Sequence, residues 1–70
     1  MGMPDRRIQR TLALTIHAAV TDAEMSAEQR ERLAATARRL ADVFKRYDRT
    51  FCFEWFFGAC GLDPWGDVAA

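Results

Sequence analysis

One apolar stripe constrains the fold of this chain more than any other feature of its sequence. It recurs at steps of four, three, four and three residues, and its members are Leu33, Ala37, Leu40, Phe44 and Tyr47. This spacing places the side chains along one side of an α-helix, which must bury that side against another element. Ser26 and Gln29 form the S-x-x-Q pattern of a capping box just before the stripe. The sequence therefore predicts a helix over residues 27–48.

Two further helices are expected on either side of this one. A stretch over about residues 5–23 has apolar side chains at helical spacing, namely Ile8, Leu12, Ile16, Ala19 and Ala23. The short connection at residues 22–26 predicts an antiparallel hairpin, and a short helix over residues 53–60, with Gly61 as its C-terminal cap, would close it. The expected fold is an all-α, compact three-helix mini-domain covering residues 1–70, with a short C-terminal turn and tail. Residues 1–4 and 66–70 are candidates for disorder.

Residues 51–57, FCFEWFF, contain five aromatic rings. The four phenylalanines are interpreted as the lid that closes the helical hairpin, whereas the helical step of 100° turns Trp55 to the other side. Two alternatives remain for Trp55. Either Trp65 folds back over it as a satellite cluster, or the two indoles form an exposed aromatic patch of the kind that marks partner surfaces. Leu14, which lies off the apolar face of the first helix, joins Trp55 and Trp65 as a candidate partner-binding residue.

The middle of the chain is basic, although the formal net charge of the whole is zero. Residues 30–50 contain seven Lys or Arg and three acids, a sum of +4. Arg32, Arg39 and Arg46 follow one line along the helix at steps of seven, and Arg38 and Lys45 follow a second line. These five residues are either a solvated helix face with internal ion pairs to Asp42, or contacts to an anion or a nucleic acid.

The sequence contains little that could support catalysis or bind a metal. His17 is the only histidine and is expected to be exposed, and there is no C-x-x-C motif or glycine-rich phosphate loop. Cys52 and Cys60 would lie roughly 12 Å apart along a helix, too far for a disulfide, which favours reduced thiols. No apolar run is long enough for a membrane span, and the N-terminus lacks the apolar core of a signal peptide. We therefore expect a cytoplasmic protein that is not an enzyme and has no cofactor, metal or membrane partner.

The segment LADVFKRYDRTFCFEWFFGACG, residues 40–61, resembles the closing segment of small uncharacterised helical proteins of actinobacteria and their phages. The shared pattern is F-x4-F-x2-A-C-G, matched here by Phe51, Phe56, Ala59, Cys60 and Gly61, with Leu40, Ala41 and Phe44 upstream. Cys52, Phe53 and Trp55 stand where the commoner form has polar residues. The resemblance implies a helical fold and brings no assigned chemistry. The departure from the pattern favours an added binding surface or self-association.

Three functions follow as hypotheses. The first is a non-enzymatic protein-interaction module, of the phage or prophage accessory type, that binds and modulates a larger protein through its aromatic surface. The second is a nucleic-acid-binding regulator that uses the line of Arg32, Arg39 and Arg46. The third is a homodimeric structural protein with an interface built from Leu14, Met25 and the third helix.

Overall fold

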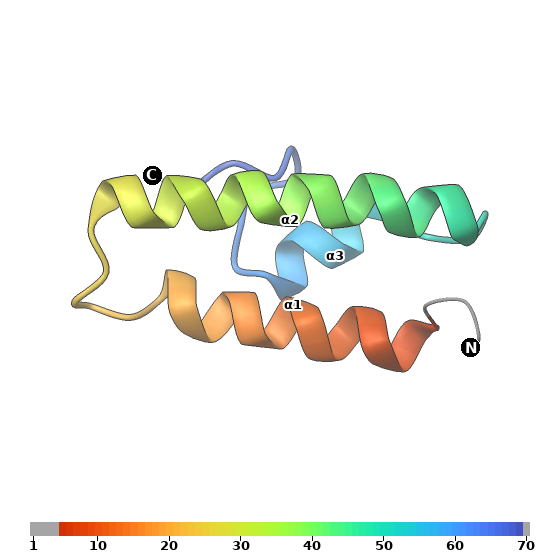
Figure 1. The fold of residues 1–70 in the computed structure, drawn as a ribbon, viewed down its shortest axis with the longest axis horizontal. Helices are drawn as coiled ribbons and strands as arrows, with labels where there is room; N and C mark the ends of the chain where they lie inside the picture. Colours follow the sequence, from red (N-terminus) through yellow and green to blue (C-terminus); the bar gives the residue numbers. More distant parts are fainter. Residues whose placement is uncertain (1–4, 70) are drawn as a thin grey trace.

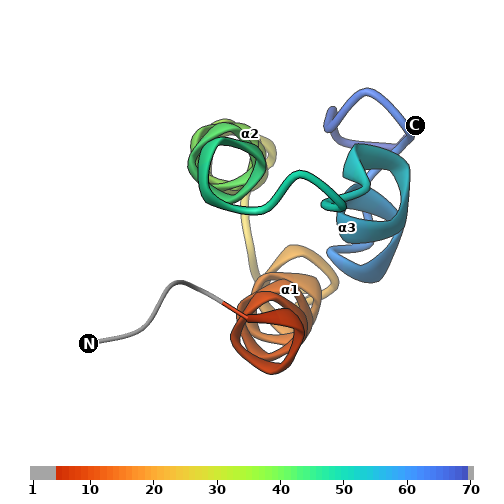
Figure 2. The same ribbon diagram turned by 90° about the vertical axis from the view of Figure 1, so that its right-hand side faces the viewer.

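The protein is an all-α domain of three helices, described by a computed structural model for residues 5–69 (Figure 1). Helix α1 covers Arg6–Val20, α2 covers Ala27–Tyr47 and α3 covers Phe53–Ala59. Helices α1 and α2 form an antiparallel hairpin, and α3 lies against one side of it (Figures 1 and 2). The three predicted helices are confirmed, with α1 ending three residues earlier than expected.

The helix ends follow local sequence signals. The capping box at the start of α2 is complete, because the Gln29 backbone amide donates to Ser26 Oγ at 3.1 Å and the Ser26 amide donates to Gln29 Oε1 at 2.9 Å. Helix α3 ends where the Leu62 amide donates to the Phe57 carbonyl oxygen at 2.9 Å. Gly61, with φ of +77°, supplies the left-handed conformation that this type of helix end requires.

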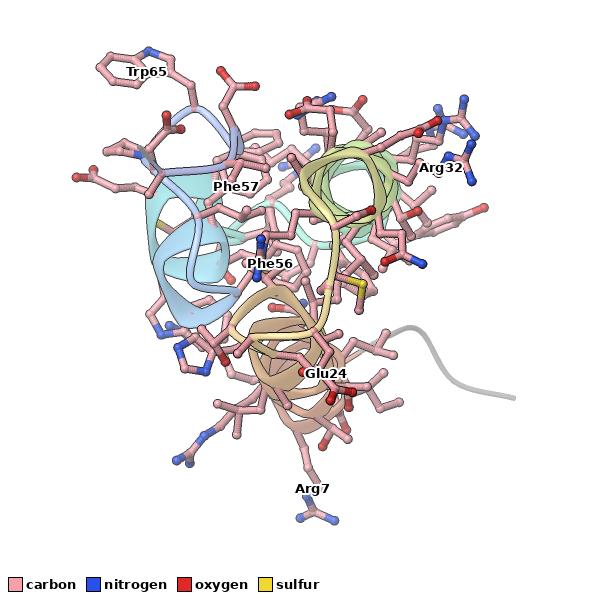
Figure 3. The ribbon with its side chains drawn as sticks, turned by 90° about the vertical axis from the view of Figure 1, so that its left-hand side faces the viewer. Arg7, Glu24, Arg32, Phe56, Phe57 and Trp65 are labelled. Carbon is pink, nitrogen blue, oxygen red and sulfur yellow. The ribbon has the colours of Figure 1, made fainter. Side chains whose placement is uncertain are left out.

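Phenylalanine rings make up the centre of the core. Phe56 is completely buried, and its ring centroid lies 5.5 Å from those of Phe44 and Phe51 and 6.1 Å from that of Phe57. These separations fall in the range of favourable aromatic pairs. Phe53 lies at the rim of the cluster, paired with Phe51 at 5.3 Å. The interpretation of the phenylalanines as a lid on the hairpin is confirmed (Figure 3).

The buried faces of α1 and α2 differ from the stripes expected from sequence. The fully or nearly buried residues of α1 are Gln9, Ala13, Ile16 and Val20, and those of α2 are Ala34, Ala37, Ala41 and Phe44. The prediction was wrong for Ile8 and Tyr47, which are 47% and 51% exposed, and Leu33 and Leu40 are only half-buried. The reason is tertiary, because each helix of the hairpin must also contact α3 and turns its buried face toward it (Figure 2).

The C-terminal tail folds back past α3 toward α2. Leu62 and Val68 form an isolated antiparallel bridge, and the Asp63 amide donates to the Asp67 carbonyl oxygen at 3.0 Å. Residues 66–69, expected as candidates for disorder, are therefore held in a defined turn. Residues 1–4 and 70, the other candidates, lie outside the described residues.

Candidate partner-binding surfaces

Trp65 is the most exposed large apolar side chain of residues 5–69, at 76% (Figure 3). Its backbone, in contrast, is held on both sides. Asp63 Oδ1 accepts hydrogen bonds from the Trp65 and Asp67 amides, both at 2.9 Å, and the Gly66 amide donates to the Asp63 carbonyl oxygen at 2.9 Å. An aspartate that bonds the backbone two residues ahead is a characteristic way to stabilise a turn. The turn therefore displays the indole from a fixed backbone.

Arg38 of α2 ties this turn to the helical body. Its Nη1 donates to the Gly66 carbonyl oxygen at 2.8 Å and to Asp67 Oδ1 at 3.0 Å, and its Nη2 lies 3.8 Å from Glu31 Oε1. Gly66 is buried between Arg38 and the ring of Phe57. One guanidinium thus joins α2 to Gly66 and Asp67, the two residues that follow Trp65.

Trp55 has a different environment from Trp65. It is half-buried against the core cluster, and the Arg6 guanidinium of α1 lies 4.7 Å from its ring centroid, a cation–π arrangement. Within residues 5–69 no ring pair joins Trp55 to Trp65, so the satellite cluster does not form. Leu14 is 50% exposed on α1. The three candidate residues therefore lie on three different elements, with Trp65 and Leu14 exposed and Trp55 largely covered.

The two lines of basic residues on α2 have different roles in the structure. Lys45 Nζ donates to the carbonyl oxygens of Arg49 and Phe51, at 3.0 and 3.2 Å, so that it stabilises the connection to α3 just as Arg38 stabilises the tail. Arg32 pairs with Glu28 at 3.0 Å, with both side chains well exposed. Arg39 and Arg46 make no side-chain hydrogen bond or ion pair to any described residue. The pairs to Asp42 expected from sequence are not formed among these residues.

No metal-binding cluster occurs in the part of the chain that the structure describes. No group of three His, Cys, Asp or Glu side chains converges there, and His17 is exposed with its ring against Gly61. Both cysteines are free, and burial raises the pKa of the Cys60 thiol to about 11. A cavity of about 440 Å³ opens near the α1–α2 loop. The Arg30 guanidinium on its wall already donates to the carbonyl oxygens of Val20 and Asp22.

Sequence reasoning missed a polar contact between the start of α1 and the end of α2. Gln9 is completely buried and donates from Nε2 to Asp48 Oδ2 at 3.0 Å, while its buried Oε1 has no hydrogen-bond partner among residues 5–69. Asp48 also accepts from the Thr50 backbone amide at 3.0 Å and from the Thr50 hydroxyl at 2.7 Å. Nothing in the spacing of apolar residues marks Gln9, because its burial depends on how α1 packs.

Asp48 is expected to make the free energy of unfolding depend on pH in the acidic range. The Thr50 hydroxyl, then the Gln9 amide and the Thr50 backbone amide, hold the pKa of Asp48 below its ordinary value of 3.8. Because the folded-state pKa is lowered, the stabilisation is present above the unfolded-state value and is lost as pH falls through the folded-state value. We expect Asp48→Asn to be less stable than the original protein near neutral pH and the difference to shrink below about pH 4.

Urea unfolding of both proteins at a series of pH values measures this difference directly. Asp42, an exposed aspartate in the middle of α2, provides the matched control as Asp42→Asn. A difference between Asp48→Asn and the original protein that stays constant from neutral to acidic pH would contradict the assignment.

The chain matches no family model, no curated protein and no solved structure. The resemblance of residues 40–61 to actinobacterial and phage proteins stays a prediction. Within residues 5–69, no helix combines the length and the apolar character needed to cross a membrane.

Proposed function

We propose that the protein is a small non-enzymatic interaction module that binds and modulates a larger protein, with Trp65 as its main contact. The observation that carries this proposal is the combination of a 76% exposed indole with a backbone held by Asp63 and Arg38. Tryptophan is among the residues most enriched at the energetic centres of protein interfaces. A side chain displayed from an ordered turn suits that role.

The rigidity of the turn matters because ordering a flexible segment opposes binding. Each side chain that becomes immobilised at an interface costs roughly 0.5–1.5 kcal/mol, and ordering its backbone adds to that cost. The hydrogen bonds around Trp65 are present before any partner arrives. Burial of the indole in a pocket of the partner would then contribute nearly its full hydrophobic free energy.

The proposal also includes the absence of a cofactor, a cytoplasmic location and a phage or prophage origin. Among residues 5–69 no group of three His, Cys, Asp or Glu side chains could hold a metal ion, which fits a role without a metal cofactor. The free thiols of Cys52 and Cys60 support a location in the reducing cytoplasm. An origin as a phage or prophage accessory protein rests only on the resemblance of the closing segment.

A photo-crosslinking experiment tests the role of Trp65. A photoreactive phenylalanine analogue is placed at position 65 in cells, and at Glu24, an exposed position in the α1–α2 loop, as the control (Figure 3). We expect one adduct of discrete mass from position 65 and none from position 24. An excess of the original protein should compete for this adduct, whereas an excess of Trp65→Ala should not.

Two results would count against the proposal. An adduct whose mass is twice that of the chain, together with dissociation on dilution, would favour the homodimer. Equal competition by the original protein and by Trp65→Ala would mean that the indole does not contribute to binding. Of the five basic residues that could contact a nucleic acid, Arg38 and Lys45 make contacts within the domain, so this alternative depends on the line of Arg32, Arg39 and Arg46.

A further inference from the structure

The side of the hairpin opposite α3 carries a row of large apolar side chains. We call this row the α1–α2 seam and define it by Ile8, Leu12, Leu33, Leu40 and Tyr47. The three leucines are half-buried, whereas Ile8 and Tyr47 are about half exposed. The bond from Gln9 to Asp48 brings the start of α1 against the end of α2, which places Ile8 and Tyr47 at the same end.

The position of the seam follows from the contacts of the other flank of α2. Arg38 and Lys45 reach the tail and the connection to α3, so that flank faces α3. By the helical step of 100° per residue, Leu33, Leu40 and Tyr47 lie on the other flank of the buried alanine row. Figure 2 shows α3 on one side of the α1–α2 pair and no other described helix on the opposite side.

Small and large apolar residues are distributed unusually between the core and this seam. The completely buried residues of α2 are Ala34, Ala37 and Ala41, while its leucines remain at the edge. Full burial of a large aliphatic side chain contributes about 1.5–3 kcal/mol, far more than burial of a methyl group. The seam side chains thus keep part of their hydrophobic free energy for a contact that residues 5–69 do not make themselves. Exposed contiguous apolar surface of this kind marks an interaction site.

Charges at the border of the seam indicate what could cover it. Arg39 and Arg46 each precede a seam residue by one position, and neither has a partner among the described side chains. They are seven residues apart, which corresponds to about 10.5 Å along the helix. Val43, 39% exposed, lies between them and the seam. An apolar row with two unpaired guanidinium groups on one side of it complements a surface that is apolar at its centre and carries carboxylates on one side.

We infer that the α1–α2 seam binds an acidic amphipathic helix of another protein. The seam runs from Leu33 to Tyr47, about 21 Å, which is the length of a helix of roughly 14 residues. Such a helix would place apolar side chains at steps of three and four residues in the seam, and its acidic flank would pair with Arg39 and Arg46. It would pack on the hairpin from the side opposite α3.

Charge favours this occupant over a second copy of the chain or a nucleic acid. In a two-fold symmetric dimer the same patch meets itself, which would bring the Arg39 and Arg46 borders of both copies to one interface. A nucleic acid would gain phosphate contacts from two unpaired arginines and nothing from the apolar seam. The inference does not rest on the proposed role of Trp65, which projects from the tail on the α3 side (Figure 3).

Two designed peptides of about 16 residues test this inference. Both have leucine at steps of three and four residues. One carries glutamate along one flank of the helix and the other carries lysine at the same positions, and the remaining positions are alanine. Each is labelled with a fluorophore, and binding is followed by anisotropy at two salt concentrations. The proteins compared are the original chain, Arg39→Glu/Arg46→Glu, Leu40→Gln and Trp65→Ala. Arg10→Glu/Arg49→Glu, with the same charge change at exposed positions that are not part of the seam, is the matched control.

We expect the original protein to bind the glutamate peptide at least about tenfold more tightly than the lysine peptide, with a preference that weakens as salt increases. The charge-reversed Arg39/Arg46 variant should invert that preference, whereas the matched control and Trp65→Ala should keep it. Leu40→Gln should weaken both peptides about tenfold. Because Arg39 and Arg46 are exposed, their reversal should leave the helical circular dichroism unchanged, so a loss of preference would not reflect unfolding.

Three outcomes would overturn the inference. The first is equal affinity for the two peptides, or a preference that survives charge reversal at Arg39 and Arg46. The second is binding of duplex DNA that is lost in the Arg39/Arg46 variant, which would assign these arginines to phosphates. The third is a concentration-dependent dimer that Leu40→Gln dissociates, which would assign the seam to a second copy.

Discussion

Replacing Phe56 with alanine is expected to lower the free energy of unfolding by about 3–5 kcal/mol. The ring is completely buried and lies within 6.1 Å, centroid to centroid, of three other phenylalanine rings. A domain of this length has a total stability of roughly 4–10 kcal/mol. The variant should therefore lose a large part of its stability, because this ring packs α3 against Phe44 of α2 and Phe51 of the connection.

Circular dichroism melting measures this effect. A loss of 3 kcal/mol corresponds to a decrease in melting temperature of roughly 12–24 °C for a domain of this size. Val43→Ala, at a partly exposed position of α2, is the matched control and should change stability by no more than about 0.5 kcal/mol. A decrease of only a few degrees for Phe56→Ala would mean that the core is not organised around this ring.

Gly66→Ala is expected to produce the second largest effect, a loss of about 2–4 kcal/mol. Gly66 has φ of +81°, a conformation that side chains with a Cβ rarely adopt. An added Cβ would also lie 2.8 Å from Phe57 Cζ and 2.9 Å from Arg38 Cγ, so the buried ring would have to move. The turn would then lose its close packing against Phe57 of α3 and Arg38 of α2.

The chain provides its own control for this substitution. Gly58 lies within α3, and a Cβ added there would meet nothing within 4 Å. Gly58→Ala should therefore be neutral or stabilise the protein by up to about 1 kcal/mol, because alanine favours the helical conformation. Urea unfolding followed by tryptophan fluorescence compares the two variants. Similar stabilities for Gly66→Ala and Gly58→Ala would contradict the conformation assigned to the turn.

The two substitutions also separate the core from the proposed binding residue. Phe56→Ala should destabilise the domain as a whole, because it removes the ring at the centre of the phenylalanine cluster. Gly66→Ala acts first on the turn that holds Trp65, so photo-crosslinking from position 65 should weaken even at temperatures where the helices remain intact. A turn that opens before the helices melt would show that the display of the indole depends on Arg38 and Gly66.

Local chemistry in the sequence was sufficient to predict the helices. Three local signals define these helices: the capping box at Ser26, the periodic stripe of α2 and the glycine after α3. Each depends on residues close together in the sequence, so its effect can be predicted without knowing the tertiary structure. The role of the phenylalanines as a lid was also predictable, because the exposed stripe of a helical hairpin needs a cover.

Only the tertiary structure decided how each helix is rotated and what its polar residues contact. Periodicity gives an apolar arc of about 100° or more but not the part of that arc that a third helix will cover. For this reason Ile8 and Tyr47 remained exposed while Gln9 was buried. Arg38 and Lys45 follow one line of α2, and Arg39 and Arg46 follow another. The positions of the tail and of the connection to α3 engage the first line and leave the second unpaired among the described residues. Side chains far apart in the sequence make that division, and no local pattern contains it.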